Sequence, residues 1–357
     1  MPVFPSLPPD LMRERLAPPT GRLRVVIDTD TANEIDDQYA LAWALLSPGK
    51  LDVLATTAEP FSFAHHLPGL RAAEAAMLSG KDYAEHLVGG FQGWITRLHK
   101  QGRGVDDLGL CGPAEGMEQS YHEILRVYDA CGIPPAGRVF RGADRYMSDG
   151  ETPIVTEAAT TIVDLAKSRG GPLYIAALGC VTNIASAILM APEIIRDIVV
   201  VWTSGYPTDA PHTNRPSLNM VQDLPASRLL FDCGVPHVYL PGYHVGAQLK
   251  LSLPEMERFV KGRGAIGDYL HRLYTHNPLH GMFALDDTAR RTWVIWDIIN
   301  IAWLMNPAWV PTFMTTSPVL DEGMFWRKDI ARHMMREAHD VQRDEIFRAF
   351  YDALPQG

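Results

Sequence analysis

Apolar runs rich in β-branched residues alternate along the chain with segments in which apolar positions recur at helical spacing. This alternation is typical of parallel βαβ units. Continuous apolar runs such as Ile198–Trp202 predict strands buried on both faces. The pattern therefore predicts an α/β fold with a mostly parallel, open, Rossmann-like central sheet and helices on both faces. Strands are expected at Leu23–Ile27, Asp52–Thr57, Leu173–Ala177, Ile198–Thr203 and His237–Leu240, and helices at Asp36–Leu46, His66–Met77, Thr182–Met190 and Pro225–Phe231.

The pattern also predicts one large domain. Six prolines lie within Met1–Thr20, so we expect residues 1–22 to form an extended arm. This stretch lacks the apolar segment of a secretion signal. Residues 23–350 are expected to form a single domain with an insertion around 88–150. Two polar stretches, Tyr206–Pro216 and Thr275–Asp287, are expected to be surface loops that can cover a site.

Composition narrows the range of partners. The formal net charge is −10 and no Lys/Arg run occurs, which argues against nucleic acid as a partner. The four cysteines lack the spacing of a disulfide framework or a thiolate zinc site. The most apolar window, Trp293–Met305, predicts a buried helix because it is shorter than the ~20 residues that span a membrane. We therefore expect a cytoplasmic protein without a membrane partner.

Acidic residues cluster directly after the first predicted strand. Asp28, Asp30, Asp36 and Asp37 surround the junction of that strand with the following helix, at the sheet edge where open α/β folds bind ligands. Asp36 alone fits a helix cap. Packed together without a cation, the four carboxylates would strongly raise one another's pKa. A bound hard cation relieves this repulsion, and all-oxygen ligands favour Ca²⁺ or Mg²⁺ over zinc.

Two other metal-linked motifs fit less well. An EF-hand loop needs Gly at its sixth place and Glu at its twelfth, where this chain has Asn33 and Tyr39. The string from Asp28 to Ala32 partly fits the nucleophile loop of haloacid-dehalogenase-like phosphatases, which use Mg²⁺. That alternative leaves the Asp36–Asp37 pair unexplained, and no later Lys and acidic-pair signature is evident.

The Asp28-x-Asp30 and Asp36-Asp37 pairs resemble the N-terminal motif of the inosine–uridine nucleoside hydrolase family, with a turn two residues longer that contains Asn33 and Glu34. Three later segments are also similar to family motifs, and the resemblance spans about residues 23–305. They are Ala177–Ala185, the Leu218-Asn219 pair with Asp223, and the Trp296-Asp297 pair, which stands where many members have His-Asp. Ser217 stands where the family usually has Glu.

The resemblance implies a function and a set of site residues. It implies hydrolysis of a ribonucleoside N-glycosidic bond with Ca²⁺ as cofactor, in a homo-oligomer, a dimer or a tetramer. Asp30 is expected to be the general base, and Asp36 and Asn219 to bind the ribose. The implied metal ligands are Asp30, Asp37, Asp297 and the Leu178 carbonyl oxygen.

Further substrate contacts are expected from Glu59, Trp296 and Asn214. Trp296 can stack on a base, but an indole cannot protonate a leaving group as a histidine can. The acid is therefore unassigned, with four histidines in or beside predicted loops as candidates: His65, His66, His276 and His280. The changes at Ser217 and Trp296 leave one alternative open, a non-catalytic protein that binds a ribosylated ligand.

Overall fold

The computed structural model describes residues 3–80, 90–285 and 292–356, and its centre is an eight-stranded sheet. The strand order is β3-β2-β1-β4-β5-β6-β12-β9, and every neighbouring pair is parallel except β12 with β9. The predicted α/β fold with a mostly parallel sheet is confirmed. The strands are β1 (Leu23–Thr29), β2 (Leu51–Ala58), β3 (Val139–Arg141), β4 (Leu173–Ala177), β5 (Ile198–Ser204), β6 (His237–Pro241), β9 (Thr312–Thr316) and β12 (Met334–Ala338).

The order of the strands reverses at β1. From this strand the chain builds outward through β2 and β3, and then returns to the other side of β1 with β4. Asp28, near the end of β1, is in register with Thr57 of β2 and with Ala177 of β4. Such a reversal opens a crevice at the carboxyl ends of the strands, so the fold places β1 and β4 at the position where a ligand is expected.

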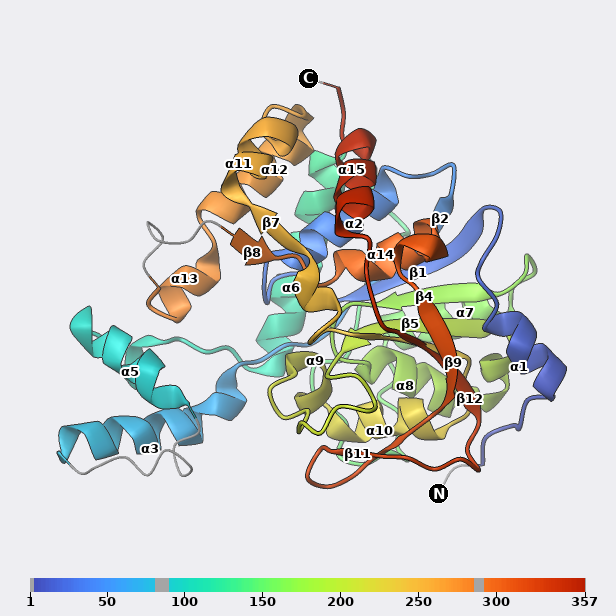
Figure 1. The fold of residues 1–357 in the computed structure, drawn as a ribbon, viewed down its shortest axis with the longest axis horizontal. Coiled ribbons are helices and arrows are strands. Elements are labelled where there is room, and N and C mark those ends of the chain that lie inside the picture. Colours follow the sequence, from blue (N-terminus) through green and yellow to red (C-terminus); the bar gives the residue numbers. More distant parts are fainter. Residues whose placement is uncertain (1–2, 81–89, 286–291, 357) are drawn as a thin grey trace.

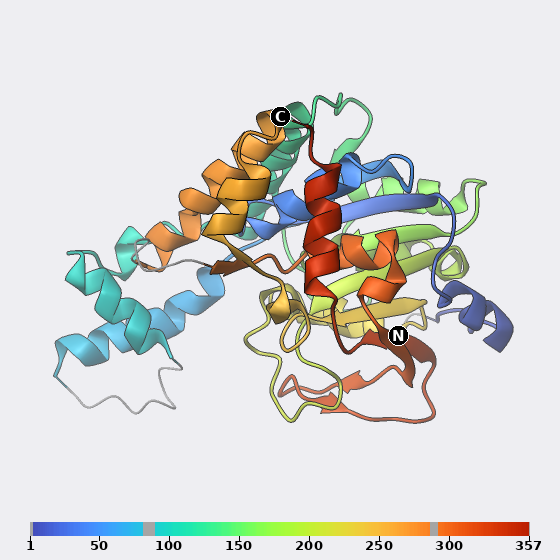
Figure 2. The same cartoon turned by 45° about the horizontal axis from the view of Figure 1, so that its top comes forward.

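Helices cover both faces of the sheet (Figures 1 and 2). The helices on one face share an apolar core with β1, and those on the other face share a second core with β4 and β5. Every residue of α2 is buried, as expected for a helix without a polar face. The first face carries α2 (Asp36–Leu45), α6 (Pro113–Ala130), α12 (Gly264–Thr275), α14 (Ile298–Met305) and α15 (Arg343–Ala353); the second carries α7 (Glu157–Lys167), α8 (Thr182–Met190) and α10 (Leu224–Asp232).

Two helices, α3 (Leu67–Leu78) and α5 (Phe91–Lys100), extend away from these layers (Figure 1). They enclose a small core of their own around Leu70 and Trp94. The indole of Trp94 donates to the Met282 carbonyl at 2.8 Å, which ties the pair to α13 (Pro278–Met282). This helical unit stands beside the sheet edge where β2 ends.

The insertion around 88–150 stays a prediction, and its residues 88–89 lie outside the described residues. Within it, α6 packs in the first helical layer and β3 is the edge strand beside β2. Only α5 belongs to the projecting pair, and its partner α3 precedes the predicted insertion. The segment therefore contributes to the main domain.

Two local predictions were wrong. The predicted extended arm contains α1 (Pro9–Arg15), and Leu16 is buried against the main domain. The predicted helix Trp293–Met305 divides into β8 (Thr292–Val294) and α14. β8 pairs with β7 (Lys250–Ser252) in one small sheet, and β10 (Val319–Leu320) pairs with β11 (Trp326–Arg327) in another. Short helices α9 (Leu218–Val221) and α11 (Leu253–Glu255) complete the fold, and no helix in the described ranges is long and apolar enough to cross a membrane.

Candidate active site

Carboxylates from the early and the late part of the chain meet at the sheet edge where the parallel strands end. Asp36 and Asp37 open α2, and Asp297 immediately precedes α14. One carboxylate oxygen from each of the three lies within 4.8 Å of the other two. Asp30, in the turn between β1 and α2, lies close enough to repel Asp37 and Asp297 electrostatically. The structure thus brings together all four aspartates that the sequence assigned to the metal and the ribose.

Burial and mutual repulsion perturb these acids strongly. The pKa values of Asp30, Asp36 and Asp297 are raised well above the usual range, first by burial and then by the neighbouring carboxylates. Burial also raises the pKa of Asp37 to about 6, against a hydrogen bond from Thr29 that lowers it. A bound divalent cation would lower these pKa values, because it favours the ionised forms of the carboxyl groups.

The donor atoms fit a hard cation. Asp30 Oδ1 and Asp36 Oδ1 are buried without a hydrogen-bond partner, although buried polar atoms are normally paired. The other oxygen of Asp30 is held by the side-chain amide of Asn33 at 2.5 Å. All-oxygen ligands around two such open acceptors suit Ca²⁺ or Mg²⁺.

The residues that follow β4 pack against these aspartates. A Cβ atom on Gly179 would lie 2.8 Å from Asp30 Cγ, so only glycine permits the close approach. The preceding Leu178 carbonyl accepts a 2.6 Å hydrogen bond from the side-chain amide of Asn219, which also donates to the Thr203 carbonyl at 3.1 Å. Asn219 therefore links α9 to the ends of β4 and β5.

A pocket of about 240 Å³ opens beside the carboxylates. It contains five of the predicted site residues: Asp36, Leu178, Asn219, Trp296 and Asp297. Acidic groups, aromatic rings and small polar residues form different parts of its lining. The other lining residues are Asn33, Glu34, Phe63, His65, His66, Thr203, Ser204, Gly205, Pro216, Ser217, Leu218, Gly242, Tyr243 and Phe283.

Two predicted substrate contacts, Glu59 and Asn214, are absent from the lining of this described pocket. Glu59 is fully buried, accepts from the Asn183 backbone N–H at 3.0 Å, and has its pKa raised by burial and by nearby Asp28. Asn214 accepts from the Tyr206 N–H at 2.7 Å and donates to the Met324 carbonyl at 3.0 Å. In this structure both side chains hold backbone segments in place.

The predicted loop Tyr206–Pro216 is firmly attached to the body of the protein. Besides the Asn214 contacts, Glu337 of β12 accepts from the Thr208 N–H at 2.8 Å and from its hydroxyl at 2.5 Å. The Tyr206 carbonyl also accepts from Tyr239 at 2.8 Å. These hydrogen bonds hold the loop in place against the rest of the protein. The second predicted loop, Thr275–Asp287, contains α13, and its last two residues lie outside the described ranges.

Two of the four candidate histidines lie at the pocket. His65 and His66 line the pocket, whereas His276 and His280 are not among its described lining residues. Burial and the neighbouring His65 lower the pKa of His66 to about 4, and burial also lowers the pKa of His65. Both imidazoles are therefore mainly neutral near pH 7, which disfavours them as proton donors.

Sequence reasoning missed several lining residues. Ser204 ends β5 and could have been found by the same strand-end rule that singled out Asp30. Glu34, in the longer turn, was noted without a role. Phe63, Tyr243 and Phe283 come from separate loops, and nothing local in the sequence connects them.

The doubly wound sheet, the buried carboxylates at its switch point and the adjoining pocket define an open α/β enzyme with a site suited to a hard cation. The chain belongs to the inosine-uridine preferring nucleoside hydrolase family, whose model matches residues 25–347. This confirms the resemblance seen in the sequence, and it makes the protein a hydrolase of N-glycosyl bonds.

Relatives and solved structures agree with this assignment. The chain is 25% identical over 292 residues to non-specific ribonucleoside hydrolase RihC of Salmonella typhimurium, covering 81% of this chain and 80% of the relative. It is 23% identical over 256 residues to probable uridine nucleosidase 2 of Arabidopsis thaliana, covering 71% and 69%. A purine-preferring ribonucleoside hydrolase from Gardnerella vaginalis shares the fold with a TM-score of 0.61 and 18% identity, over 92% of this chain and 97% of that one.

Proposed function

We propose that the protein is a calcium-dependent enzyme that hydrolyses the N-glycosidic bond of a ribonucleoside, releasing ribose and the free base. One observation carries the proposal. One carboxylate oxygen each from Asp36, Asp37 and the distant Asp297 lie within 4.8 Å of one another, and Asp36 and Asp297 line the pocket. Family membership supports the reaction, and the all-oxygen donor set supports calcium.

The proposed calcium ligands are the carboxylates of Asp30, Asp37 and Asp297 and the carbonyl oxygen of Leu178. When bound, the ion would act as a Lewis acid that acidifies a water molecule and orients the ribose diol. The open acceptor on Asp30 supports its place in this set. The Leu178 carbonyl, which already accepts from Asn219, has a second lone pair for a ligand.

Asp30 is proposed as the general base. It takes a proton from the water that attacks C1′ of the ribose, and the Asn33 amide fixes its orientation. Asp36 and Asn219, both on the pocket wall, would hold the ribose hydroxyls. The buried carboxylates then stabilise the positive charge that develops on the sugar in an oxocarbenium-like transition state. Trp296 would stack against the base.

The geometry disfavours the phosphatase alternative. That mechanism needs Asp28 as an exposed nucleophile, but Asp28 is fully buried and hydrogen-bonded to Thr57 at 2.5 Å and to Asn183 at 3.0 Å. The described pocket lining contains carboxylates and no Lys or Arg, so a phosphate group would meet repulsion.

A reducing-sugar assay over a panel of ribonucleosides tests the proposal directly. Free ribose should appear, should cease after chelation, and should return when calcium is added. Release of phosphate from a phosphomonoester with Mg²⁺ would support the phosphatase instead. Saturable nucleoside binding without free ribose would support the non-catalytic alternative.

The cytoplasmic location and the homo-oligomer stay predictions of the sequence. Light scattering after size-exclusion chromatography would measure the second, with a dimer or tetramer expected.

A further inference from the structure

The pocket and its surroundings hold more carboxylates than the proposed calcium ion uses as ligands. Asp36, Asp297 and Glu34 line it, and Asp30 and Asp37 stand close by. The proposed ligand set uses the carboxylates of Asp30, Asp37 and Asp297, which leaves those of Asp36 and Glu34. Asp36 is only 3% exposed, and its Oδ1 has no hydrogen-bond partner although the residue lines the pocket. The site therefore has carboxylate acceptors available to a ligand beyond the metal.

Glu34 extends this charge from the metal cluster toward the aromatic wall. Asp36 and Asp37 act on Glu34 electrostatically, and the Trp293 side chain lies near its carboxylate. Burial and Asp37 raise the pKa of Glu34 to about 7, and a cation beside the carboxylate would favour its ionised form. Glu34 also acts electrostatically on Tyr243. The Oε2 atom is buried without a hydrogen-bond partner. Glu34 therefore offers the pocket a carboxylate acceptor near both the aspartates and Tyr243.

Other parts of the pocket lining are aromatic. Tyr243 and Trp296 pack edge-to-face with their ring centroids 5.8 Å apart, and Phe63 packs in the same way on Phe283 at 6.2 Å. Aromatic faces attract cations through the ring quadrupole, and the attraction is stronger when the cation is desolvated. Carboxylate and aromatic rings together are the chemistry that recognises a flat organic cation.

Among the described lining residues, no imidazole is readily protonated near pH 7 to assist a departing base. Trp296 has replaced the histidine expected from the family motif, and the two lining histidines have lowered pKa values. A neutral base leaves most readily when it is protonated. A base whose glycosidic nitrogen already carries positive charge needs no such proton.

We propose that this site prefers ribonucleosides with a cationic base, such as an N-ribosylated pyridinium, and that Glu34 is the residue that recognises the positive charge. The inference rests on the proposed nucleoside hydrolase function. In the reaction, a water oxygen forms a bond to C1′ while the C1′–N bond breaks. The electron pair of that bond passes to the ring nitrogen, which leaves as neutral pyridine, and the proton of the water goes to Asp30 and then to solvent.

The test compares N1-(β-D-ribofuranosyl)pyridinium with uridine as substrates of the calcium-loaded full-length enzyme. The measured quantity is the ratio of kcat/KM for the cation to kcat/KM for uridine, which cancels effects on the shared ribose site. In Glu34→Gln this ratio should fall about tenfold or more, because an amide keeps the shape and removes the charge. The matched control is Glu193→Gln, an exposed residue before the start of β5, far from the strand ends that form the site.

Binding gives a second readout independent of turnover. The N-methylpyridinium cation should quench the tryptophan fluorescence of the wild-type protein at lower concentration than pyridine does, and Glu34→Gln should weaken that difference. An unchanged kcat/KM ratio in a folded Glu34→Gln enzyme would overturn the inference and leave the hydrolase proposal intact. Failure of the calcium-loaded wild type to hydrolyse either nucleoside, or any other in the panel, would overturn the proposed function itself.

Discussion

The Asp30 carboxylate is held in one orientation and still offers an oxygen atom to a ligand. It lies in the turn after β1 with one oxygen bonded to Asn33 and the other without a hydrogen-bond partner. The bonded oxygen fixes the orientation, and the open oxygen is available to a metal or to water. Gly179, two residues after the end of β4, lies against the carboxylate and leaves no room for a side chain.

Replacing Asp30 with Asn should keep the fold and lower kcat by about 10²–10⁴-fold, because the amide cannot accept the proton of the attacking water. Steady-state kinetics with calcium titration would separate lost turnover from lost metal. Asp10→Asn on the exposed face of α1 is the matched control. Unchanged turnover in Asp30→Asn would refute the general-base assignment.

Gly179→Ala should weaken calcium binding by about tenfold or more without altering any ligand. The added Cβ would lie 2.8 Å from Asp30 Cγ and 2.9 Å from Oδ1, so the carboxylate must move. Isothermal titration calorimetry measures the affinity, and circular dichroism checks the fold. An affinity equal to wild type would show that Asp30 is not held where we place the ion.

His237 illustrates a residue that controls stability far from the site. It is 1% exposed at the start of β6, and burial together with nearby His333 lowers its pKa to about 3. Because the folded pKa lies below the unfolded value near 6.5, the stability it contributes is complete above pH 6.5. That stability is lost as the pH falls toward 3, by up to about 1.4 kcal/mol per pH unit.

His237→Phe should therefore flatten the dependence of the unfolding free energy on pH between about 6.5 and 4. The ring would still pack among Trp202, Phe231 and Tyr239. Urea denaturation at a series of pH values measures the slope, with the exposed His339→Phe as control. Identical slopes in wild type and His237→Phe would contradict this account.

At the scale of elements, two junctions build the site. The β1–α2 junction supplies Asp30, Asp36 and Asp37, and the short turn between β8 and α14 supplies Trp296 and Asp297. The position of β8 depends on β7, since Lys250 pairs with Val294 across that small sheet. The position of the turn between β8 and α14 therefore depends on how β7 is attached to the rest of the protein.

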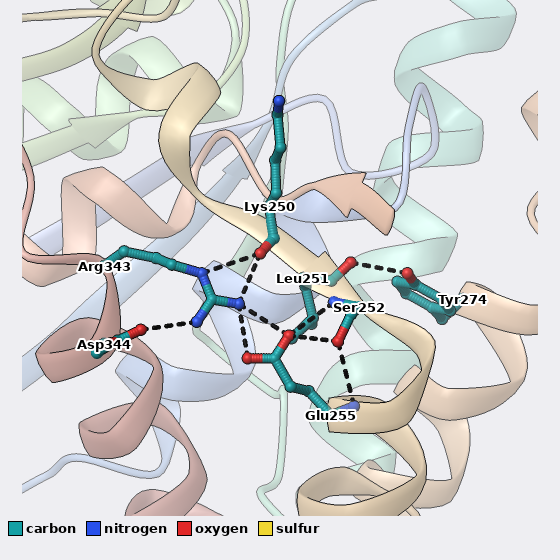
Figure 3. Close-up of polar contacts among 7 residues, drawn as sticks. All are labelled: Lys250, Leu251, Ser252, Glu255, Tyr274, Arg343 and Asp344. Atoms are coloured by element: carbon teal, nitrogen blue, oxygen red, sulfur yellow. Dashed lines mark hydrogen bonds and ion pairs between the residues drawn. The ribbon is translucent and has the colours of Figure 1, made fainter. Parts of the chain in front are cut away.

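Arg343 of α15 provides that attachment (Figure 3). Its guanidinium donates to the Lys250 carbonyl at 2.7 Å and to both carboxylate oxygens of Glu255, at 2.6 and 2.8 Å. Glu255 in turn forms a capping box with Ser252, and the Tyr274 hydroxyl donates to the Leu251 carbonyl at 2.7 Å. One side chain thus connects the last helix to the strand that positions β8.

Arg343→Met should lower the unfolding free energy by about 1–2 kcal/mol, a modest value because the Arg343 side chain is 30% exposed and solvent screens the ion pair. The matched control is Arg348→Met on the same helix, where the exposed pair with Glu345 contributes little. Chemical denaturation gives both values. Equal effects of the two substitutions would argue against a special role for Arg343.

At the scale of the whole molecule, two large cores hold the sheet between its helical layers, and smaller clusters stabilise the structures around the pocket. The cluster of Phe61, Phe63 and Leu279 joins the segment after β2 to α13. The carboxylates repel one another at the centre of this arrangement, so the metal-free protein stores unfavourable electrostatic energy.

Calcium should accordingly stabilise the folded protein. At a calcium concentration one hundred times the Kd, the unfolding free energy rises by about 2.7 kcal/mol through preferential binding to the folded state. Differential scanning fluorimetry should show a higher Tm with calcium, and Asp297→Asn should reduce the increase. A Tm unaffected by calcium would sink the metal assignment.

The amino-acid sequence by itself determined the fold class, the main strands and the acidic turn, because hydrophobic periodicity and short motifs are local properties. It also indicated the family, through motifs whose residues lie close together in the chain. The two wrong local predictions arose where a local sequence pattern fits more than one structure. Prolines suggested an extended arm, yet Pro9 opens α1, since proline is favoured in the first turn of a helix. Apolar residues alone could not separate β8 from α14.

Only the tertiary structure decided which side chains share the pocket. The strand-end rule identifies an edge of the sheet but not the direction of a side chain, so it singled out Glu59, which turns into the protein toward Asn183. The order of the strands brings Asp297 to Asp37, and long-range packing brings Glu34 to Trp293. Those contacts join residues far apart in the chain, and their geometry follows from how the layers pack, which no local pattern encodes.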